Sequence, residues 1–286
     1  MRMTAETPYA PVRTVAITGG ARGIGRATAQ ACLASGMRVV IGDVDGTACA
    51  AVAAELGELA VGLPLDVRSA EQFEEFLHKA ENAIGPLDAL VNNAGIGPIG
   101  RFVDEDPAET QRVLDINLGG VLTGTRLALK SFLPRGRGHI VNLASSAGQI
   151  APAGGATYAA TKHGVVGFTR AIRAETKGTG VRTTIVMPGL IRTDMIAGFA
   201  KARATRVVGP ELVAAAIVHA LRTGRPEVFV PRELGAIARL IAGTPPALSD
   251  RIKRALRIDS VMTEADMSAR ADYRHRLAKT VSGRRP

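Results

Sequence analysis

The chain has 286 residues, of which 46% are hydrophobic and 22% are charged, and its formal net charge is +10. This composition supplies enough apolar surface for a buried core and excludes an intrinsically disordered chain. No apolar run approaches the roughly 20 residues of a membrane-spanning helix, and the first residues lack the apolar stretch of a signal peptide. Cys32 and Cys49 have no metal-ligand spacing and are typical of small core residues in a reducing compartment. We therefore expect a cytoplasmic protein without a metal site.

The positive charge is concentrated toward the C-terminus. Residues 1–199 contain 19 Lys and Arg against 18 Asp and Glu, whereas residues 200–286 contain 17 against 8. A basic segment of this kind binds nucleic acid, anionic lipid or an acidic substrate, or it simply faces water. With three Tyr, seven Phe and no Trp, the chain offers few side chains for stacking on bases. We therefore expect no nucleic-acid partner.

The first predicted elements are a strand, a glycine-rich turn and a helix. The apolar residues 15–17 are typical of a strand buried on both faces, and residues 26–34 are rich in helix formers. Between them stand Gly19, Gly23 and Gly25, one step away from the common dinucleotide spacing. Glycines at these positions let the backbone approach a diphosphate. The N–H groups at the start of the helix attract the negative charge of this diphosphate. Glycines also form ordinary tight turns, but the place directly after a strand favours a nucleotide site.

A second buried strand, residues 37–41, leads to Asp43. An acidic residue at this place in a dinucleotide site hydrogen-bonds the ribose hydroxyls, and its charge repels the additional phosphate of NADP. The alternative is a turn aspartate, a task for which Asp45 is better placed. Arg22 and Arg38 favour the additional phosphate, so the acidic residue favours NAD whereas the two arginines favour NADP. We expect NAD, with NADP as the alternative, because the acid at the strand end contacts the ribose directly.

The chain up to residue 231 continues to alternate strands with helices, as in parallel sheets with right-handed crossovers. The sequence therefore predicts an α/β fold with a single doubly wound, seven-stranded parallel sheet that has helices on both faces. Residues 1–231 form this domain, and residues 232–286 form a basic helical extension whose last few residues are disordered. The further predicted strands are residues 59–67, 87–91, 138–143, 181–187 and 227–230, and the further helices are residues 47–56, 70–84, 107–133, 158–177 and 210–221.

Polar residues follow the predicted strands, at the sheet edge where such folds bind their ligands. Asn92 and Asn93 come directly after a strand, where asparagines are also common turn formers. Asn117 stands inside a predicted helix, an unfavourable place for asparagine, so we expect a kink or an inward polar role. Tyr158 and Lys162 are spaced to lie one helical turn apart on the same face.

Together these motifs closely resemble the short-chain dehydrogenase/reductase family, over about residues 14–231. Their order and spacing are specific in combination, including the 13-residue interval between Ser145 and Tyr158. The resemblance implies a Rossmann-type fold in which Asp66 and Val67 bind the adenine and Thr193 contacts the nicotinamide carboxamide. The cofactor-binding residues that it implies are Thr18, Gly19, Arg22, Gly23, Ile24, Gly25, Asp43, Asp66, Val67, Asn93, Ala94, Gly95, Tyr158, Lys162, Pro188, Gly189 and Thr193.

The resemblance also implies catalysis by Asn117, Ser145, Tyr158 and Lys162. Interconverting an alcohol and a ketone by hydride transfer requires a proton transfer at the oxygen, and a phenol with a pKa of about 10 is a poor base at neutral pH. An ammonium one helical turn away favours the phenolate. We expect Tyr158 to act as the acid and base, while Lys162 lowers its pKa and binds the nicotinamide ribose. Ser145 would position the substrate oxygen, and Asn117 would hold a water between Lys162 and solvent.

The predicted pocket walls are residues 96–99, 149–153 and 190–199, which are mostly apolar. Apolar walls favour a lipophilic small-molecule substrate, such as a sterol, a retinoid or a long-chain alcohol or ketone. The leading hypothesis is an NAD-dependent alcohol dehydrogenase or ketone reductase. The alternatives are an NADPH-dependent ketoreductase, a non-catalytic nucleotide-binding regulator and a lipid-surface scaffold. Members of the family usually form homodimers or homotetramers, and Val165, Val166, Phe168 and Ile172 offer an apolar surface for pairing.

The extension combines arginines with apolar residues in three segments: one about residues 234–241, one at residues 248–257 and one at residues 263–280. A basic amphipathic helix can lie on an anionic membrane surface. The alternative is that its apolar side covers the substrate pocket or the sheet edge. Residues 243–246, Gly-Thr-Pro-Pro, exclude one long helix, so we favour packing against the body over membrane binding.

Overall fold

The computed structural model describes residues 11–200 and 206–279, so the predicted disorder at residues 282–286 lies outside the described residues. Its centre is a sheet of seven parallel strands in the order β3-β2-β1-β4-β5-β6-β7. This confirms the predicted α/β fold and each of its strands, with shifts of a few residues at their ends. The strands are β1 (Thr14–Thr18), β2 (Arg38–Asp43), β3 (Ala60–Pro64), β4 (Ala89–Asn92), β5 (Gly138–Leu143), β6 (Val181–Pro188) and β7 (Glu227–Val230).

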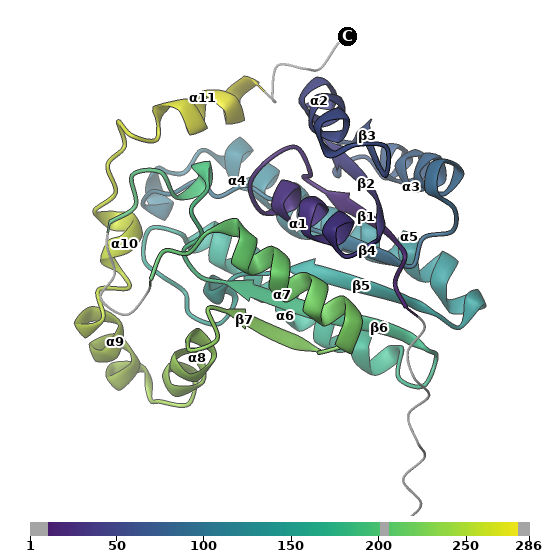
Figure 1. Ribbon diagram of the computed structural model, residues 1–286. Coiled ribbons are helices and arrows are strands. Elements are labelled where there is room, and N and C mark those ends of the chain that lie inside the picture. The colour runs from purple at the N-terminus through teal and green to yellow at the C-terminus, as the bar shows by residue number, and fades with distance from the viewer. Residues whose placement is uncertain (1–10, 201–205, 280–286) are drawn as a thin grey trace, which may run out of the picture.

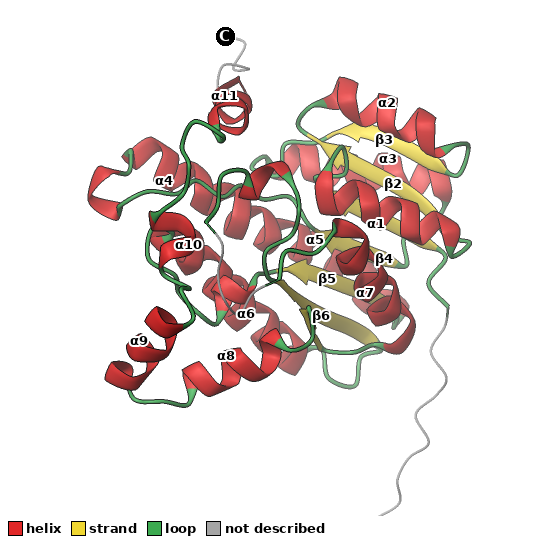
Figure 2. Cartoon of the chain, turned by 60° about the vertical axis from the view of Figure 1, so that its left-hand side comes forward, coloured by secondary structure: helices red, strands yellow, loops and turns green. Residues whose placement is uncertain are grey.

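Helices cover both faces of the sheet (Figures 1 and 2). Alternate residues of β1 show how, because Val15 and Ile17 face one hydrophobic cluster while Ala16 faces another. The first cluster includes residues of α1 (Gly23–Ala34), α2 (Gly46–Leu56) and α7 (Pro210–Thr223). On the opposite face pack α3 (Ala70–Ile84), α5 (Gly120–Arg135) and α6 (Ala156–Glu175). Central strands such as β1 and β4 are therefore buried on both sides, as their continuous apolar runs predict, whereas the edge strands β3 and β7 are mostly half-buried.

The predicted interruption at Asn117 is a short π-helical turn. Residues 107–133 were expected to be one helix, and the structure forms α4 (Pro107–Leu114), the turn η2 (Asp115–Gly119) and α5 in direct succession. The Asn117 side chain is fully buried and bonds to backbone groups of Ile96 instead of facing water. The turn thus carries a polar side chain inward, to the region where the strands end.

After β7 the chain forms α8 (Leu234–Ala242), α9 (Pro246–Ala255), α10 (Ser260–Thr263) and α11 (Ala271–Lys279). Figure 1 shows these helices in an arc along the side of the domain to which the strand arrows point. The third predicted segment, residues 263–280, is not helical throughout, because the Asp266 carboxylate accepts hydrogen bonds from the backbone N–H groups of Ser268 and Ala269 and so forms a turn before α11. None of the described helices is long and apolar enough to cross a membrane.

Candidate active site

The glycine loop after β1 is tied to the loop after β4. The Thr18 hydroxyl accepts hydrogen bonds from the backbone N–H groups of Asn93 and Ala94, both at 3.0 Å. In return, the Asn93 amide donates to the carbonyls of Thr18 and Gly19. The sequence predicted Thr18 and Asn93 as cofactor residues, and the structure shows that their side chains fix the two loops on which a cofactor would rest.

The shape of the glycine loop requires two of its glycines. Gly19 has a φ of +65°, and a Cβ atom there would lie 2.9 Å from the Cα of Ala94. A Cβ atom on Gly25 would lie 2.1 Å from the carbonyl oxygen of Gly19. The start of α1 can therefore pack directly against the end of β1 only because side chains are missing at these positions.

The start of α1 fits a dinucleotide diphosphate. Asp45, Ser69 and Asp106 cap α2, α3 and α4 with side-chain hydrogen bonds, whereas the Arg22 side chain makes no such bond at the start of α1. The first turn of α1 also has no acidic residue. The N–H groups at the start of α1 and the positive end of its dipole can therefore bind an anion. Of the four helices α1 to α4, α1 is the one that follows the glycine loop.

Asp43 lies at the end of β2, beside the glycine loop, where one carboxylate oxygen accepts from the Ala21 N–H at 3.1 Å and the other from the Asp45 N–H at 3.2 Å. The Arg22 guanidinium forms an ion pair with Asp45 at 3.2 Å. Arg38, also considered as a phosphate ligand, begins β2 and stands about 16 Å from Asp43 along the strand. Arg38 is therefore at the wrong end of the sheet, and Arg22 already has an anionic partner.

The other predicted cofactor residues line the same cavity, which has a volume of about 2420 Å³. Asp66 forms a two-pronged contact with Arg68, and although partial burial raises the pKa of this carboxyl, the bonds from Arg68 bring it below its usual range. The methyl group of Thr193 approaches Gly23, so the segment after β6 closes over the glycine loop. The cavity is lined by Gly19, Arg22, Gly23, Ile24, Asp43, Asp66, Val67, Asn93, Ala94, Gly95, Pro188, Gly189 and Thr193.

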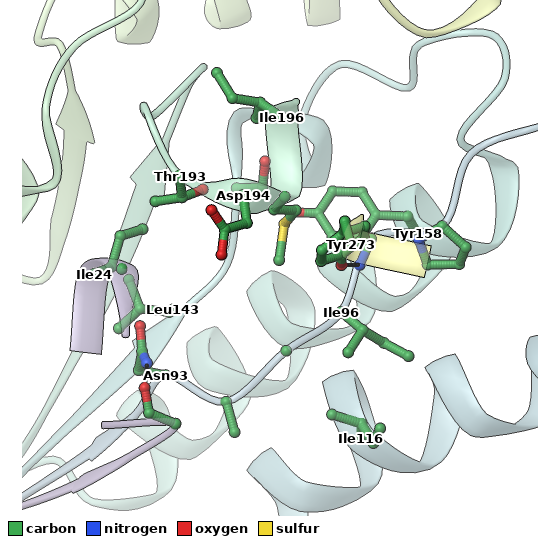
Figure 3. Close-up of a pocket in the computed structure, with 18 of the residues that line it drawn as sticks. Ile24, Asn93, Ile96, Ile116, Leu143, Tyr158, Thr193, Asp194, Ile196 and Tyr273 are labelled. Atoms are coloured by element: carbon green, nitrogen blue, oxygen red, sulfur yellow. Dashed lines mark hydrogen bonds between the residues drawn. The ribbon is translucent and has the colours of Figure 1, made fainter. Parts of the chain in front are cut away.

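Ser145, Tyr158 and Lys162 meet in this cavity (Figure 3 labels Tyr158 among its walls). Ser145 follows β5, and its hydroxyl accepts from the Ala147 N–H at 3.1 Å. Tyr158 and Lys162 stand one turn apart on α6, with the Lys162 nitrogen 5.7 Å from the centre of the Tyr158 ring. The structure thus places these three residues around one cavity, and their catalytic roles stay a prediction.

The ionisation of this group is set by burial. Burial raises the pKa of Tyr158, and a hydrogen bond with Ser145 opposes that rise. Burial also lowers the pKa of Lys162 to about 8. Lys162 as a residue is 5% exposed, and its ammonium donates to the Leu143 carbonyl at 2.9 Å, with no carboxylate as a partner among the described residues. Burial, and not the expected effect of Lys162, therefore has the larger influence on the pKa of Tyr158.

Asn117 clamps the loop after β4 with both ends of its amide. Its oxygen accepts from the Ile96 N–H and its nitrogen donates to the Ile96 carbonyl, both at 2.8 Å, with a further bond to the Thr161 hydroxyl at 3.3 Å. A Cβ atom on Gly95 would lie 3.3 Å from the Asn117 oxygen and 3.6 Å from the Lys162 nitrogen. Asn117 and Lys162 therefore meet at Gly95, while the predicted water between Lys162 and solvent stays a prediction.

Two residues of the cavity region, Arg270 and Tyr273, come from the extension and were not predicted from the sequence. Tyr273 lines the cavity (Figure 3). The guanidinium of the buried Arg270 stacks against the Tyr273 ring at 5.1 Å. One signal was available, because Tyr273 is one of only three tyrosines in the chain. A buried arginine has no such signal, since basic residues in an extension are normally solvated.

The comparisons agree with this geometry. A family profile described as short chain dehydrogenase matches residues 13–204. The ketoacyl reductase HetN of Nostoc sp. is 35% identical over 254 residues, which cover 85% of this chain and 88% of that protein. A 3-alpha-(or 20-beta)-hydroxysteroid dehydrogenase of Mycobacterium tuberculosis is 40% identical over 179 residues, or 63% of this chain and 69% of that protein. The crystal structure of a 3-ketoacyl-(acyl-carrier-protein) reductase from Brucella melitensis, complexed with NADH, superposes with a TM-score of 0.73 at 27% identity, covering 78% of this chain and 98% of that one.

Proposed function

This chain belongs to the short-chain dehydrogenase/reductase family of oxidoreductases, and on that premise we propose that it interconverts a ketone and a secondary alcohol with NAD(H). The main support for the proposal is that Ser145, Tyr158 and Lys162 line one cavity. This cavity extends to the start of α1, which has no side-chain cap. A dinucleotide bound there would supply or accept the hydride. A panel of lipophilic ketones and alcohols, assayed by nicotinamide absorbance with each cofactor, tests the proposal.

The residues themselves supply the proton chemistry. In the reductive direction, the Tyr158 hydroxyl gives its proton to the carbonyl oxygen as the hydride reaches the carbonyl carbon, and the reverse occurs on oxidation. Ser145 holds the carbonyl oxygen in place beside Tyr158. Burial raises the pKa of Tyr158, which suits the proton donor needed for reduction. The Lys162 ammonium then stabilises the phenolate that forms, at a place where water competes little.

Asp43 supports a preference for NAD over NADP. Its carboxylate lies at the end of β2, where the adenosine ribose binds in folds of this type, and Arg22 is paired with Asp45. We expect Asp43→Ala to relax the preference, so that the ratio of kcat/KM for NAD to that for NADP falls by about tenfold or more.

Asp43→Asn is the matched control for this experiment. It keeps an acceptor for the Ala21 N–H but removes the charge, so a fall in the ratio in both variants assigns the effect to charge and not to a disturbed glycine loop. A wild-type protein that already prefers NADP by kcat/KM would show the argument from Asp43 to be wrong and would turn attention to Arg22.

The walls of the cavity support a lipophilic substrate. Besides the predicted segments, which contribute Ile150, Met195 and Phe199, the extension adds apolar residues that the core of the fold does not provide. The volume of about 2420 Å³ exceeds the roughly 300–1,000 Å³ of an ordinary ligand pocket, which leaves room for a substrate beside a dinucleotide. The names of the relatives, a ketoacyl reductase and a hydroxysteroid dehydrogenase, point to the same class of lipophilic carbonyl compounds. The extension's share of these walls is Leu234, Ile237, Ile258, Val261, Met262, Met267 and Tyr273.

A homodimer or homotetramer remains our proposal for the assembly. Of the four apolar residues on α6, Val165 and Val166 are buried against the sheet within one chain, which leaves the half-buried Phe168 and Ile172 for an interface. We expect light scattering at micromolar concentration to give the mass of a dimer or tetramer. A monomeric mass would refute the proposal.

A further inference from the structure

The extension contributes polar contacts at the substrate end of the cavity, and these have no role in the function proposed above. Arg270 is 1% exposed, and its guanidinium donates to the carbonyls of Met195 at 2.8 Å, Ala197 at 3.0 Å and Gly97 at 3.0 Å. It thereby joins the extension to the segment after β6 and to the loop after β4. No described carboxylate pairs with it, so its charge is compensated by three carbonyl dipoles and by stacking on Phe199 at 4.8 Å.

Further bonds fix the same junction. The N–H of Asp266 donates to the Gly198 carbonyl at 2.8 Å, and the N–H of Ala200 donates to the Val261 carbonyl at 3.0 Å. Arg276 forms an ion pair with Asp194 at 2.7 Å. The segment after β6 is therefore held on the extension by backbone and side-chain contacts together, and the position of Tyr273 between them is well defined.

Tyr273 has an unused hydrogen-bond donor. Its ring is 8% exposed, and its hydroxyl oxygen accepts from the Gly97 N–H at 2.8 Å. No acceptor among the described residues takes the hydroxyl proton, although the hydroxyl lies in a cavity wall. A buried donor without a partner is costly, and the energy is recovered if a ligand supplies an acceptor.

The unused donor lies beside the proposed catalytic tyrosine. Gly97 is the shared neighbour, because a Cβ atom there would lie 3.8 Å from the Tyr158 ring while its N–H binds the Tyr273 hydroxyl. Figure 3 shows both tyrosines in the same pocket, Tyr158 from α6 and Tyr273 from α11. Burial raises the pKa of Tyr273 to about 12, so near neutral pH its hydroxyl keeps the proton and serves as a donor, not as a second base.

We propose that Tyr273 contacts the substrate and donates its hydroxyl proton to a second oxygen of a carbonyl compound whose ketone is held at Ser145 and Tyr158. The substrate class is then a ketone with a neighbouring hydrogen-bond acceptor, such as a 3-oxo ester or thioester, in preference to an isolated ketone. A site built to hydrogen-bond a substrate group discriminates against analogues that lack this group. This inference rests on the proposed ketone reductase activity, and Arg270 acts in it as a positioning residue.

The test compares two substrates in two proteins. The substrates are a 3-oxo ester and a matched ketone in which an alkyl chain of equal length replaces the ester. We expect Tyr273→Phe to lower kcat/KM for the 3-oxo ester by about tenfold and kcat/KM for the ketone much less. The ratio of the two values from one sample does not depend on the fraction of folded protein, so a partly destabilised variant still gives a result.

Arg270→Lys is the positioning control. Lysine cannot reproduce the three-carbonyl contact of the guanidinium, so Tyr273 is displaced, and we expect this variant to lower kcat/KM for the 3-oxo ester more than kcat/KM for the ketone. An equal loss for both substrates in Tyr273→Phe would mean that the hydroxyl only supports Gly97, and this would overturn the inference. Absence of turnover of both substrates by the wild-type protein would instead contradict the proposed function, so the two failures are distinguishable.

Discussion

Tyr158→Phe is expected to lower kcat/KM for ketone reduction by about a hundred- to ten-thousand-fold, because it removes the proton donor and leaves the shape of the ring unchanged. The Tyr158 ring lies in the cavity wall, and Lys162 and Ser145 are its polar neighbours. Their backbone positions do not depend on the phenol oxygen. The measurement is the initial rate of nicotinamide absorbance change with a ketone that the wild-type protein reduces.

Nucleotide affinity is the control for Tyr158→Phe. The glycine loop, its anchors Thr18 and Asn93, and Asp43 all lie on β1, β2 and β4 or their loops, so titration with the reduced cofactor should give a Kd within about threefold of the wild-type value. Retained turnover in this variant would exclude Tyr158 as the acid and base. Loss of turnover together with loss of nucleotide binding would mean that the substitution had disturbed the whole site.

Lys162→Met is expected to reduce turnover by at least about a hundredfold, since the phenolate would lose the ammonium that stabilises it. The same substitution is expected to remove the unfavourable free energy of burying a protonated lysine in the folded protein. Burial lowers the pKa of Lys162 from 10.5 to about 8, which means that the protonated side chain is less favourable in the folded protein than in the unfolded chain. The shift corresponds to about 3 kcal/mol.

This free-energy cost has a defined dependence on pH. Below pH 8 Lys162 is protonated in both the folded protein and the unfolded chain, so the buried ammonium destabilises the folded protein by the full amount. Between about pH 8 and 10.5 the unfolded chain still holds this proton, whereas the folded protein has released it. The wild-type protein therefore gains stability relative to Lys162→Met across this interval. Urea unfolding at a series of pH values measures the difference, and Lys79→Met, at an exposed lysine of α3, is the matched control for the loss of a lysine. A difference that stays constant from pH 7 to 10.5 would contradict the pKa assigned to Lys162.

The fold could be predicted from the sequence because its signals are local and repeated. Strands such as β1 and β4 are short runs of apolar residues, and the glycine or asparagine at their ends shows where each one stops. The interruption at Asn117 was also predictable, since asparagine is unfavourable inside a helix. Tyr158 and Lys162 could be placed together from their helical spacing, and the family resemblance joined Ser145 to them.

The contribution of the extension could not be predicted, because it depends on contacts between residues distant in sequence. Arg270 binds the Gly97 carbonyl across 173 positions, and Tyr273 binds the Gly97 N–H across 176. Nothing in a basic stretch distinguishes an arginine that packs among carbonyls from one that faces water. The expectation that the extension packs against the body agrees with the buried Leu234, Ala238 and Ile241 of α8, while its behaviour at a membrane stays a prediction.

The central claim is that a hydride passes to a substrate carbonyl held at Tyr158. The most direct measurement incubates the wild-type protein with a 3-oxo ester and a reduced nicotinamide cofactor in which both hydrogens of the hydride-bearing carbon are replaced by deuterium. Mass spectrometry of the product should show one deuterium, bonded to the new carbinol carbon, with no such product from Tyr158→Phe in the same time. An alcohol product without deuterium, or cofactor binding without any product from the whole range of lipophilic ketones, would contradict the account.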